Sequence, residues 1–294
     1  MKKPFNPIQL STTYDAHDPR LLETVLPHVH YLEVTPDTIT RKVGDKIVYH
    51  EGILSDLKAV SKDVEILVHG VGLSIGSYDG FSMEYIRLLD MLFNEIPVAW
   101  HSEHLGYTQV DGVQLNTMLA MPRTNETLDM LCERIEFIRN RYHIPFALEN
   151  IMRILPDDEN PYSDAEFLNL LARNSGCKLI LDTYNLECDV KNHGLDADAF
   201  LKELDMTAVQ EIHVAGGIEY NGFQLDIHSD TVSDETIALT QKALLSPQNQ
   251  IKALTYELLP QAVPVLGYAK IEAELRRLSQ IFSLKPQKRS HATC

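Results

Sequence analysis

Glu211-Ile-His-Val-Ala-Gly-Gly217, followed shortly by Leu225-Asp-Ile-His-Ser-Asp230, is the stretch around which this chain is organised. His213 closes a strand-like run of apolar residues. Asp226 and His228 lie two positions apart, so in an extended segment their side chains point the same way. The same order recurs along the chain: an apolar run ends in His, Glu or Asp, and a turn and a helix follow. This recurrence predicts a barrel that presents metal ligands at the ends of its strands.

The composition is that of an ordinary globular protein. The chain has 294 residues, of which 44% are hydrophobic and 23% charged, and this length allows a large core. Because α/β barrels often use such a length for one domain, we expect one domain over 1–284 and a flexible basic tail over 285–294. The net charge of -16 disfavours nucleic acid as a partner, since an acidic surface repels phosphates.

Cysteine usage and apolar runs indicate the cellular setting. None of the four cysteines, Cys132, Cys177, Cys188 and Cys294, forms a C-x-x-C pair. The first residues lack the apolar core of a signal peptide, and no apolar run is long enough to span a membrane. The sequence therefore predicts a reduced, cytoplasmic protein without membrane partners.

Short apolar runs alternate with amphipathic segments. The runs resemble parallel strands buried on both faces and cover 8–12, 31–35, 65–70, 98–105, 146–150, 179–184, 209–215 and 253–258. The amphipathic segments cover 19–29, 51–62, 82–95, 125–141, 163–174, 196–205, 233–245 and 267–282. Eight such units in strict alternation predict a (β/α)8 TIM barrel. A doubly wound open sheet is the alternative, but it usually has a glycine-rich turn after its first strand, and none follows 8–12. Two longer loops, 36–50 and 106–124, would wall a pocket.

Ligand-type side chains gather at the predicted strand ends, where such barrels place their sites. They are Glu33, His69, His101, Glu103, His104, Glu149, Asn150, Asp182, Asn185, His213, Asp226, His228 and Glu257. One such residue alone is more often a core or capping residue, but six consecutive strand ends each have a His or a carboxylate. Charged groups there are costly unless they are paired or bound to metal. The set suits iron, manganese or zinc, and it exceeds the roughly four to six ligands of one ion, which favours two or three ions.

The orientation of the fourth strand stays open in the sequence. Ala99, His101 and Glu103 share one face, whereas Trp100, Ser102 and His104 share the other. Alternation does not say which face is inside, so His101 or Glu103 could also be a ligand. The glycine-rich segment 69–77 could bind an anion or form a tight turn.

At these residues the chain resembles the DUF692 (UPF0276) family, which contains the multinuclear non-haem iron oxidases related to the methanobactin enzyme MbnB. The shared motifs are His69-Gly-Val-Gly-Leu-Ser-Ile-Gly76, Ser102-Glu-His-Leu105, Glu149-Asn150, Leu181-Asp-Thr-Tyr-Asn185, Asn192-His-Gly-Leu-Asp196, Glu211-Ile-His-Val-Ala-Gly216 and Asp226-Ile-His228. The resemblance covers residues 8–280 and implies a xylose-isomerase-like TIM barrel with two or three irons. By motif, the implied ligands are His69, His104, Glu149, Asp182, Asn185, His213, Asp226, His228 and Glu257, with His104 favoured over His101.

The resemblance also implies an activity. Characterised members act on cysteines of ribosomally made precursor peptides, use dioxygen as co-substrate, and work with a small partner protein that binds the peptide's leader. We therefore expect an iron-dependent, peptide-modifying oxidase.

The chain departs from the family pattern at the pocket wall. The family commonly has Asn where this chain has Tyr184, and His where it has Gly217. Its last strand often reads Ile-Glu-Trp-Asp, in place of Tyr256-Glu-Leu-Leu259. These changes leave the ligands in place and alter the surroundings of the substrate.

Three other functions fit a metal-binding barrel. A sugar isomerase or epimerase would need a Lys or His acid–base beside the metal, and no lysine stands at the strand ends. A zinc phosphodiesterase acting on DNA would have to overcome the negative charge. A non-catalytic metal-binding protein would bind metal without turnover.

Overall fold

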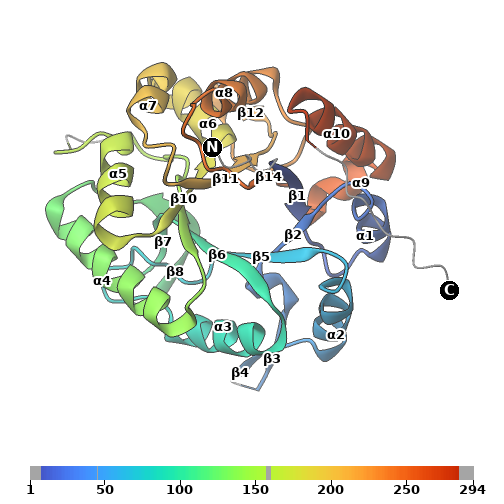
Figure 1. Ribbon diagram of the computed structural model, residues 1–294. Helices are drawn as coiled ribbons and strands as arrows, with labels where there is room; N and C mark the ends of the chain where they lie inside the picture. The colour runs from blue at the N-terminus through green and yellow to red at the C-terminus, as the bar shows by residue number, and fades with distance from the viewer. Residues whose placement is uncertain (1–7, 45, 157–159, 285–294) are drawn as a thin grey trace, which may run out of the picture.

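The computed structural model describes residues 8–44, 46–156 and 160–284, and its centre is a closed barrel of parallel strands (Figure 1). The strands are β1 (Gln9–Thr13), β2 (Tyr31–Val34), β5 (Glu65–Gly70), β6 (Val98–His104), β9 (Phe146–Glu149), β10 (Lys178–Asp182), β11 (Val209–Val214) and β14 (Ala253–Tyr256). They pair in the order β1-β14-β11-β10-β9-β6-β5-β2, and the ring closes between β2 and β1. Each strand matches a predicted apolar run, so the TIM barrel is confirmed and the open sheet is wrong. The predicted tail, 285–294, lies outside the described residues.

Helices surround this barrel (Figure 1). They are α1 (Pro19–Val25), α2 (Glu51–Val60), α3 (Met83–Glu95), α4 (Asn125–Tyr142), α5 (Asp164–Ser175), α6 (Thr183–His193), α7 (Ala197–Glu203), α8 (Asp234–Leu244), α9 (Val263–Leu266) and α10 (Tyr268–Ile281), with short 3-10 helices η1 (Pro36–Ile39) and η2 (Pro260–Ala262). Side chains cap several of them: Ser163 accepts a hydrogen bond from the Glu166 N–H at 3.0 Å at the start of α5. Such caps fix where each helix leaves the barrel wall.

Helix α6 is absent from the sequence prediction. It follows β10 without a loop, and the last strand residue, Asp182, is its N-cap. Residues 183–189 of this helix are all buried, so no polar stripe distinguishes one face from another in the sequence. The predicted strand 179–184 therefore ends at Asp182, and Tyr184 belongs to the helix.

The two long loops that were predicted as pocket walls contain antiparallel hairpins. Segment 36–50 contains η1 and the pair β3 (Thr40–Val43) and β4 (Lys46–Tyr49). Segment 106–124 contains β7 (Gly106–Val110) and β8 (Val113–Ala120), and a third hairpin of β12 (Glu219–Tyr220) and β13 (Phe223–Gln224) follows β11. All three follow the carboxyl ends of barrel strands, and they stand around the mouth of the barrel.

The structure settles the orientation of β6. Trp100 lies inside the barrel, in a cluster with Tyr31, Leu67 and Ala253. His101 lies on the outer face, where its ring contacts Phe93 of α3 and Tyr142 of α4. Because strand side chains alternate, Ser102 and His104 face inward with Trp100.

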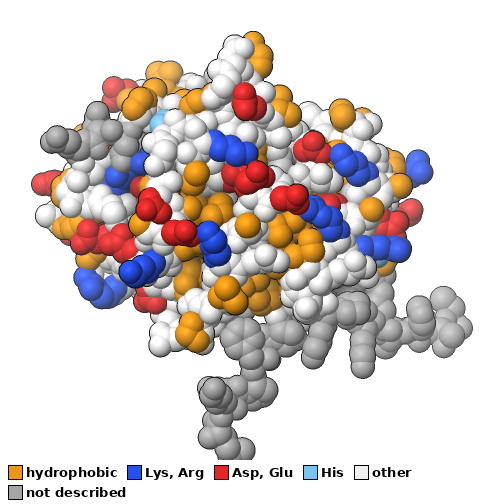
Figure 2. All heavy atoms as spheres, turned by 90° about the horizontal axis from the view of Figure 1, so that it is seen from above, with side chains coloured by type: hydrophobic (Ala, Val, Ile, Leu, Met, Phe, Trp, Pro, Cys, Tyr) orange, Lys and Arg blue, Asp and Glu red, His pale blue; other side chains and the backbone are white. Residues whose placement is uncertain are grey.

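On the flank covered by α7, α8 and α10, the charged side chains do not form a patch of one sign. Figure 2 shows acidic and basic side chains interspersed there, with hydrophobic side chains between them. Among the described residues, no helix is both long enough and apolar enough to cross a membrane.

Candidate metal centre

The first group of ligand side chains joins β5, β6 and β9. Glu149 Oε2 lies 2.9 Å from His69 Nε2 and 3.6 Å from His104 Nε2. The other ring nitrogens are held by the wall: Ser102 Oγ lies 2.9 Å from His69 Nδ1, and the Gly70 carbonyl lies 2.9 Å from His104 Nδ1. Both histidines therefore present Nε2 to the carboxylate.

The second group joins β9, β10, β11 and β14. His213 Nδ1 lies 3.3 Å from Glu149 Oε1 and 3.2 Å from Glu257 Oε2. One ligand atom each from Glu149, Asp182, His213 and Glu257 lies within 4.8 Å of the others. Glu149 thus belongs to both groups, as a carboxylate shared between two ions would.

The third group comes from the segment after β11. His228 Nε2 lies 2.6 Å from Asp226 Oδ1 and 3.7 Å from Glu257 Oε2. The segment is irregular, and His228 has a positive φ of 39°, yet the two side chains converge as predicted. A hydrogen bond of 3.0 Å from the Leu259 N–H to the His228 carbonyl ties this segment to the chain after β14.

Asn185 completes the nine predicted ligands, in the first turn of α6. Its backbone N–H donates to Asp182 Oδ1 at 2.8 Å, and its side-chain Nδ2 donates to the Asn150 carbonyl at 3.1 Å. Its Oδ1 is buried without a hydrogen bond. The structure therefore gathers the predicted residues at the carboxyl ends of the strands; their role as ligands stays a prediction.

Two further carboxylates, Glu33 and Glu211, lie beneath His213. Glu33 Oε2 is 3.2 Å and Glu211 Oε1 is 3.5 Å from His213 Nε2. The sequence analysis found Glu33 at a strand end and missed Glu211. Glu211 precedes His213 by two positions in β11, so strand alternation could have placed it inside the barrel.

The cluster contains more carboxylates than histidines, and the pKa values of both are shifted by their neighbours. Burial would raise the pKa of the Glu149 carboxyl, but the three neighbouring histidines hold it well below its usual range. Burial would lower the pKa of His69, but Glu149 and a second carboxylate raise it to about 9. For Asp182, burial and the neighbouring carboxylates raise the pKa well above its usual range. A bound cation would relieve this repulsion.

The donor atoms also fit a metal. Buried nitrogen and oxygen atoms without a hydrogen bond are rare in proteins, yet the cluster is rich in them: Glu149 Oε2, Asp182 Oδ2, Asn185 Oδ1, both nitrogens of His213, Asp226 Oδ1, His228 Nε2 and Glu257 Oε2. Nitrogen and oxygen donors without cysteine suit iron, manganese or zinc.

Tyr184 and Gly217, two of the departures from the family pattern, lie against each other. A Cβ at position 217 would collide with the Tyr184 hydroxyl and the Leu225 carbonyl. The Tyr184 hydroxyl donates to that carbonyl at 2.9 Å and accepts from Gln224 Nε2 at 2.8 Å. The tyrosine thus fills the space that a larger residue at 217 would need.

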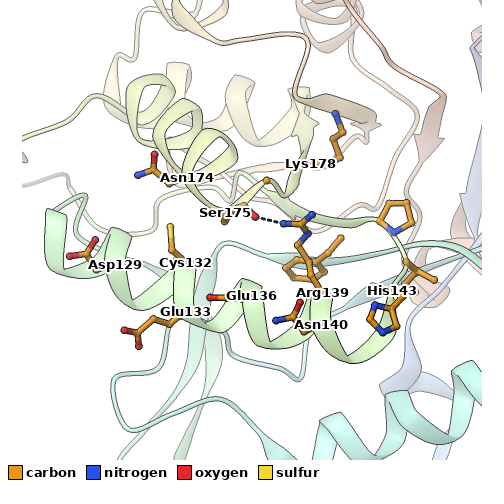
Figure 3. Close-up of a pocket in the computed structure, with 14 residues that line it drawn as sticks. Asp129, Cys132, Glu133, Glu136, Arg139, Asn140, His143, Asn174, Ser175 and Lys178 are labelled. Carbon is orange, nitrogen blue, oxygen red and sulfur yellow. Dashed lines mark hydrogen bonds between the residues drawn. The ribbon is translucent and has the colours of Figure 1, made fainter.

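A groove of about 1070 Å³ lies elsewhere, between the C-terminal parts of α4 and α5 (Figure 3). Its walls include Cys132, His143 and Lys178, and Arg139 donates across it to the Ser175 carbonyl. Lys178 begins β10, so the groove opens at the amino ends of the strands. Barrels of this kind keep their chemistry at the other end.

The fold and the buried cluster define a TIM-barrel protein whose buried side chains could bind metal. The family model of the RiPP precursor modification enzymes MbnB/TglH/ChrH matches residues 15–270, and the chain belongs to this family, whose members modify ribosomally made peptides. A UPF0276 protein of Rhizorhabdus wittichii is 31% identical over 188 residues, which are 64% of this chain and 67% of that protein. The predicted family is confirmed.

Solved structures support the fold. A D-psicose 3-epimerase from Clostridium cellulolyticum superposes with a TM-score of 0.56 at 10% identity, covering 94% of this chain and 99% of that one. Endonuclease IV of Thermus thermophilus gives a TM-score of 0.55 at 12% identity, covering 94% and 98%. At such identities the likeness shows a shared barrel and no shared reaction.

Proposed function

We propose that this protein is a multinuclear non-haem iron oxidase that uses dioxygen to modify cysteine residues of a ribosomally made precursor peptide. We also propose that the enzyme works with a small partner protein that binds the leader of the precursor peptide. The family membership supports a peptide substrate. The observation that supports the metal centre is the convergence, at the barrel mouth, of buried nitrogen and oxygen atoms that have no hydrogen bond.

The nine ligands of the proposal are His69, His104, Glu149, Asp182, Asn185, His213, Asp226, His228 and Glu257. Two or three ions fit them better than one, because Glu149 contacts three histidines and Glu257 contacts two. Carboxylates with histidines on both sides could each be shared between two ions. Iron bound here would supply redox chemistry with dioxygen and a Lewis-acidic position for a thiolate.

The chain's own residues would orient the ligands and shape the cavity. Ser102 and Gly70 fix the rings of His69 and His104, and Tyr184 ties α6 to the loop before Asp226. Glu149 and Asp182 are almost fully buried, so bulk water is kept from that side of the centre. The free cysteines Cys132, Cys177 and Cys188 fit a reduced, cytoplasmic setting.

Anaerobic reconstitution tests this function. The purified protein, loaded with ferrous iron, is mixed with a Cys-containing precursor peptide and its partner protein, with and without air. We expect bound iron at two or three equivalents and a change in peptide mass that needs air. Turnover without dioxygen would favour an isomerase-type reaction, and a protein that binds no iron would refute the proposal.

A ligand variant with a matched control ties the activity to the cluster. Glu257→Gln removes a buried carboxylate next to two histidines, whereas Glu272→Gln makes the same change at a more exposed site on α10. We expect the first variant to lose iron and turnover, and the second to keep both. Equal iron content in the two variants would remove Glu257 from the ligand set.

A further inference from the structure

The ring of His213 faces the ligand cluster with a different nitrogen from the rings of His69 and His104. In His69 and His104, Nδ1 is held by a hydroxyl or a backbone carbonyl, and Nε2 is directed at Glu149. In His213, Nδ1 is directed at Glu149 and Glu257, and Nε2 is directed at Glu33. The nitrogen that faces the ligand cluster therefore differs between these histidines.

The carboxylates on the far side of His213 have different surroundings. Glu211 is fully engaged: its Oε2 accepts a hydrogen bond of 2.7 Å from Trp100 Nε1, and its Oε1 accepts one from the Thr255 hydroxyl. Glu33 is 1% exposed, and its Oε2 has no hydrogen bond. Glu33 Oε2 lies 3.2 Å from His213 Nε2, and neither of these two buried atoms has a hydrogen bond to another group.

Glu33, Glu211 and His213 have ligand atoms close enough for an additional ion, but the surroundings argue against one. Both oxygens of Glu211 already accept hydrogen bonds. Beneath them the barrel is packed with Tyr31, Leu67, Trp100 and Ala253, so an ion there would lack further donors. Histidines that bind metal through one nitrogen usually donate the other N–H to a carboxylate or carbonyl.

We propose that Glu33 is a positioning residue that accepts the Nε2 proton of His213 and so presents Nδ1 to the metal centre. Glu211, held by Trp100 and Thr255, supports the same ring from a second direction at 3.5 Å. This role rests on the metal centre proposed above. It assigns the Nε2–H tautomer to His213 and the Nδ1–H tautomer to His69 and His104.

Nitrogen NMR of the wild-type protein tests the assignment directly. The protein is labelled with 15N-histidine and loaded with diamagnetic Zn²⁺, and long-range 1H–15N correlations identify the protonated nitrogen of each ring. We expect Nε2–H in His213 and Nδ1–H in His69 and His104. Nδ1–H in His213 would overturn the proposal, and this test needs no variant that must fold.

Metal binding by Glu33→Gln tests the positioning role. Competition with a chromophoric chelator measures Co²⁺ affinity, and Glu274→Gln is the matched control, because Glu274 is 4% exposed and bonds to Val232 and Arg277 away from the cluster. We expect Glu33→Gln to weaken Co²⁺ binding about 10–100-fold, to shift the visible Co²⁺ spectrum, and to keep the wild-type number of ions. The control should match wild type in all three.

The outcomes separate this role from the proposed function. If the wild-type protein binds no Co²⁺ and no iron, the metal centre itself fails, and the role of Glu33 fails with it. If the wild type binds and Glu33→Gln matches it in affinity and spectrum, only the positioning role fails. Loss of one whole ion from Glu33→Gln would make Glu33 a ligand and would also overturn the proposal.

Discussion

The buried, neutral ring of His101 should make a pH-dependent contribution to the stability of this barrel, and this contribution should weaken in mild acid. The ring is fully buried on the outer face of β6, where it contacts Phe93 and Phe146. Its Nε2 lies 3.0 Å from Glu103 Oε1. Burial, assisted by the charge of His69, lowers the pKa of His101 to about 3, while burial raises the pKa of Glu103 well above its usual range. The ring of His101 is therefore neutral at neutral pH and hydrogen-bonded to Glu103.

The sign and size of the effect follow from these pKa values. Below pH 6.5, His101 takes up a proton in the unfolded chain and not in the folded one, so its contribution to stability falls as the pH falls toward 3. The raised pKa of Glu103 contributes with the opposite sign, so the two contributions have to be separated by a variant. Each pH unit in that window costs about 1.4 kcal/mol. Between pH 7.5 and pH 5.0 the contribution of His101 is therefore a loss of about 2 kcal/mol. His101→Gln keeps a hydrogen-bonding group and cannot titrate, so this loss should vanish.

Urea titrations of the metal-free protein at the two pH values measure the effect. The readout is the difference in unfolding free energy between pH 7.5 and pH 5.0, so any cost of the substitution that does not depend on pH cancels. His17→Gln, at an exposed position, is the matched control and should behave as wild type. If the unfolding free energy of His101→Gln changes by the same amount as that of wild type between the two pH values, the ring is not held neutral and the reasoning is refuted.

Two more predictions concern the pocket wall and the cysteines. Gly217→Ala should destabilise the fold by about 1–3 kcal/mol in urea titration, because its Cβ would collide with the Tyr184 hydroxyl. Adding Tyr184→Phe to this variant should recover part of the loss. An unchanged urea midpoint for Gly217→Ala would show that the loop shifts freely. Burial raises the pKa of Cys177 to about 11 and that of Cys188 further. Among the cysteines that the structure describes, iodoacetamide at pH 8 should therefore modify the partly exposed Cys132 before Cys177 and Cys188, as peptide mass analysis would show. Equally fast labelling of Cys177 would contradict its burial.

The barrel could be predicted because its strands are short apolar runs that end in polar ligand-type residues. All eight appear within a few residues of their predicted bounds. The hairpins could not be predicted, because their strands are largely exposed and lack an alternating buried face: in β8, Val113, Gln114, Asn116 and Thr117 are all exposed. Helix α6 was missed for the opposite reason, since burial on every side removes the amphipathic period.

The site could be predicted where the candidate ligands stand at strand ends. It could not be predicted where the answer depends on which face of a strand points into the barrel. His69, Glu149 and His213 each close an apolar run, so their position alone indicated a shared mouth. The choice between His101 and His104 needed the three-dimensional packing of β6. Glu211 lies within a strand and not at its end, so it was not counted among the ligand-type residues, although its two-residue spacing from His213 puts both side chains on one face.

The N-cap of α6 makes Asp182 a connection between the helix and the proposed metal centre. Its Oδ1 accepts from the N–H groups of Tyr184 and Asn185, and its Oδ2 is buried and unpartnered. The backbone therefore locks this carboxylate in one rotamer before any ion arrives, which lowers the entropy lost on metal binding. Replacement by alanine would unravel the helix start and empty the ligand position together, whereas Asp182→Asn can keep the cap through its remaining oxygen. Only the asparagine variant can separate helix capping from ligation.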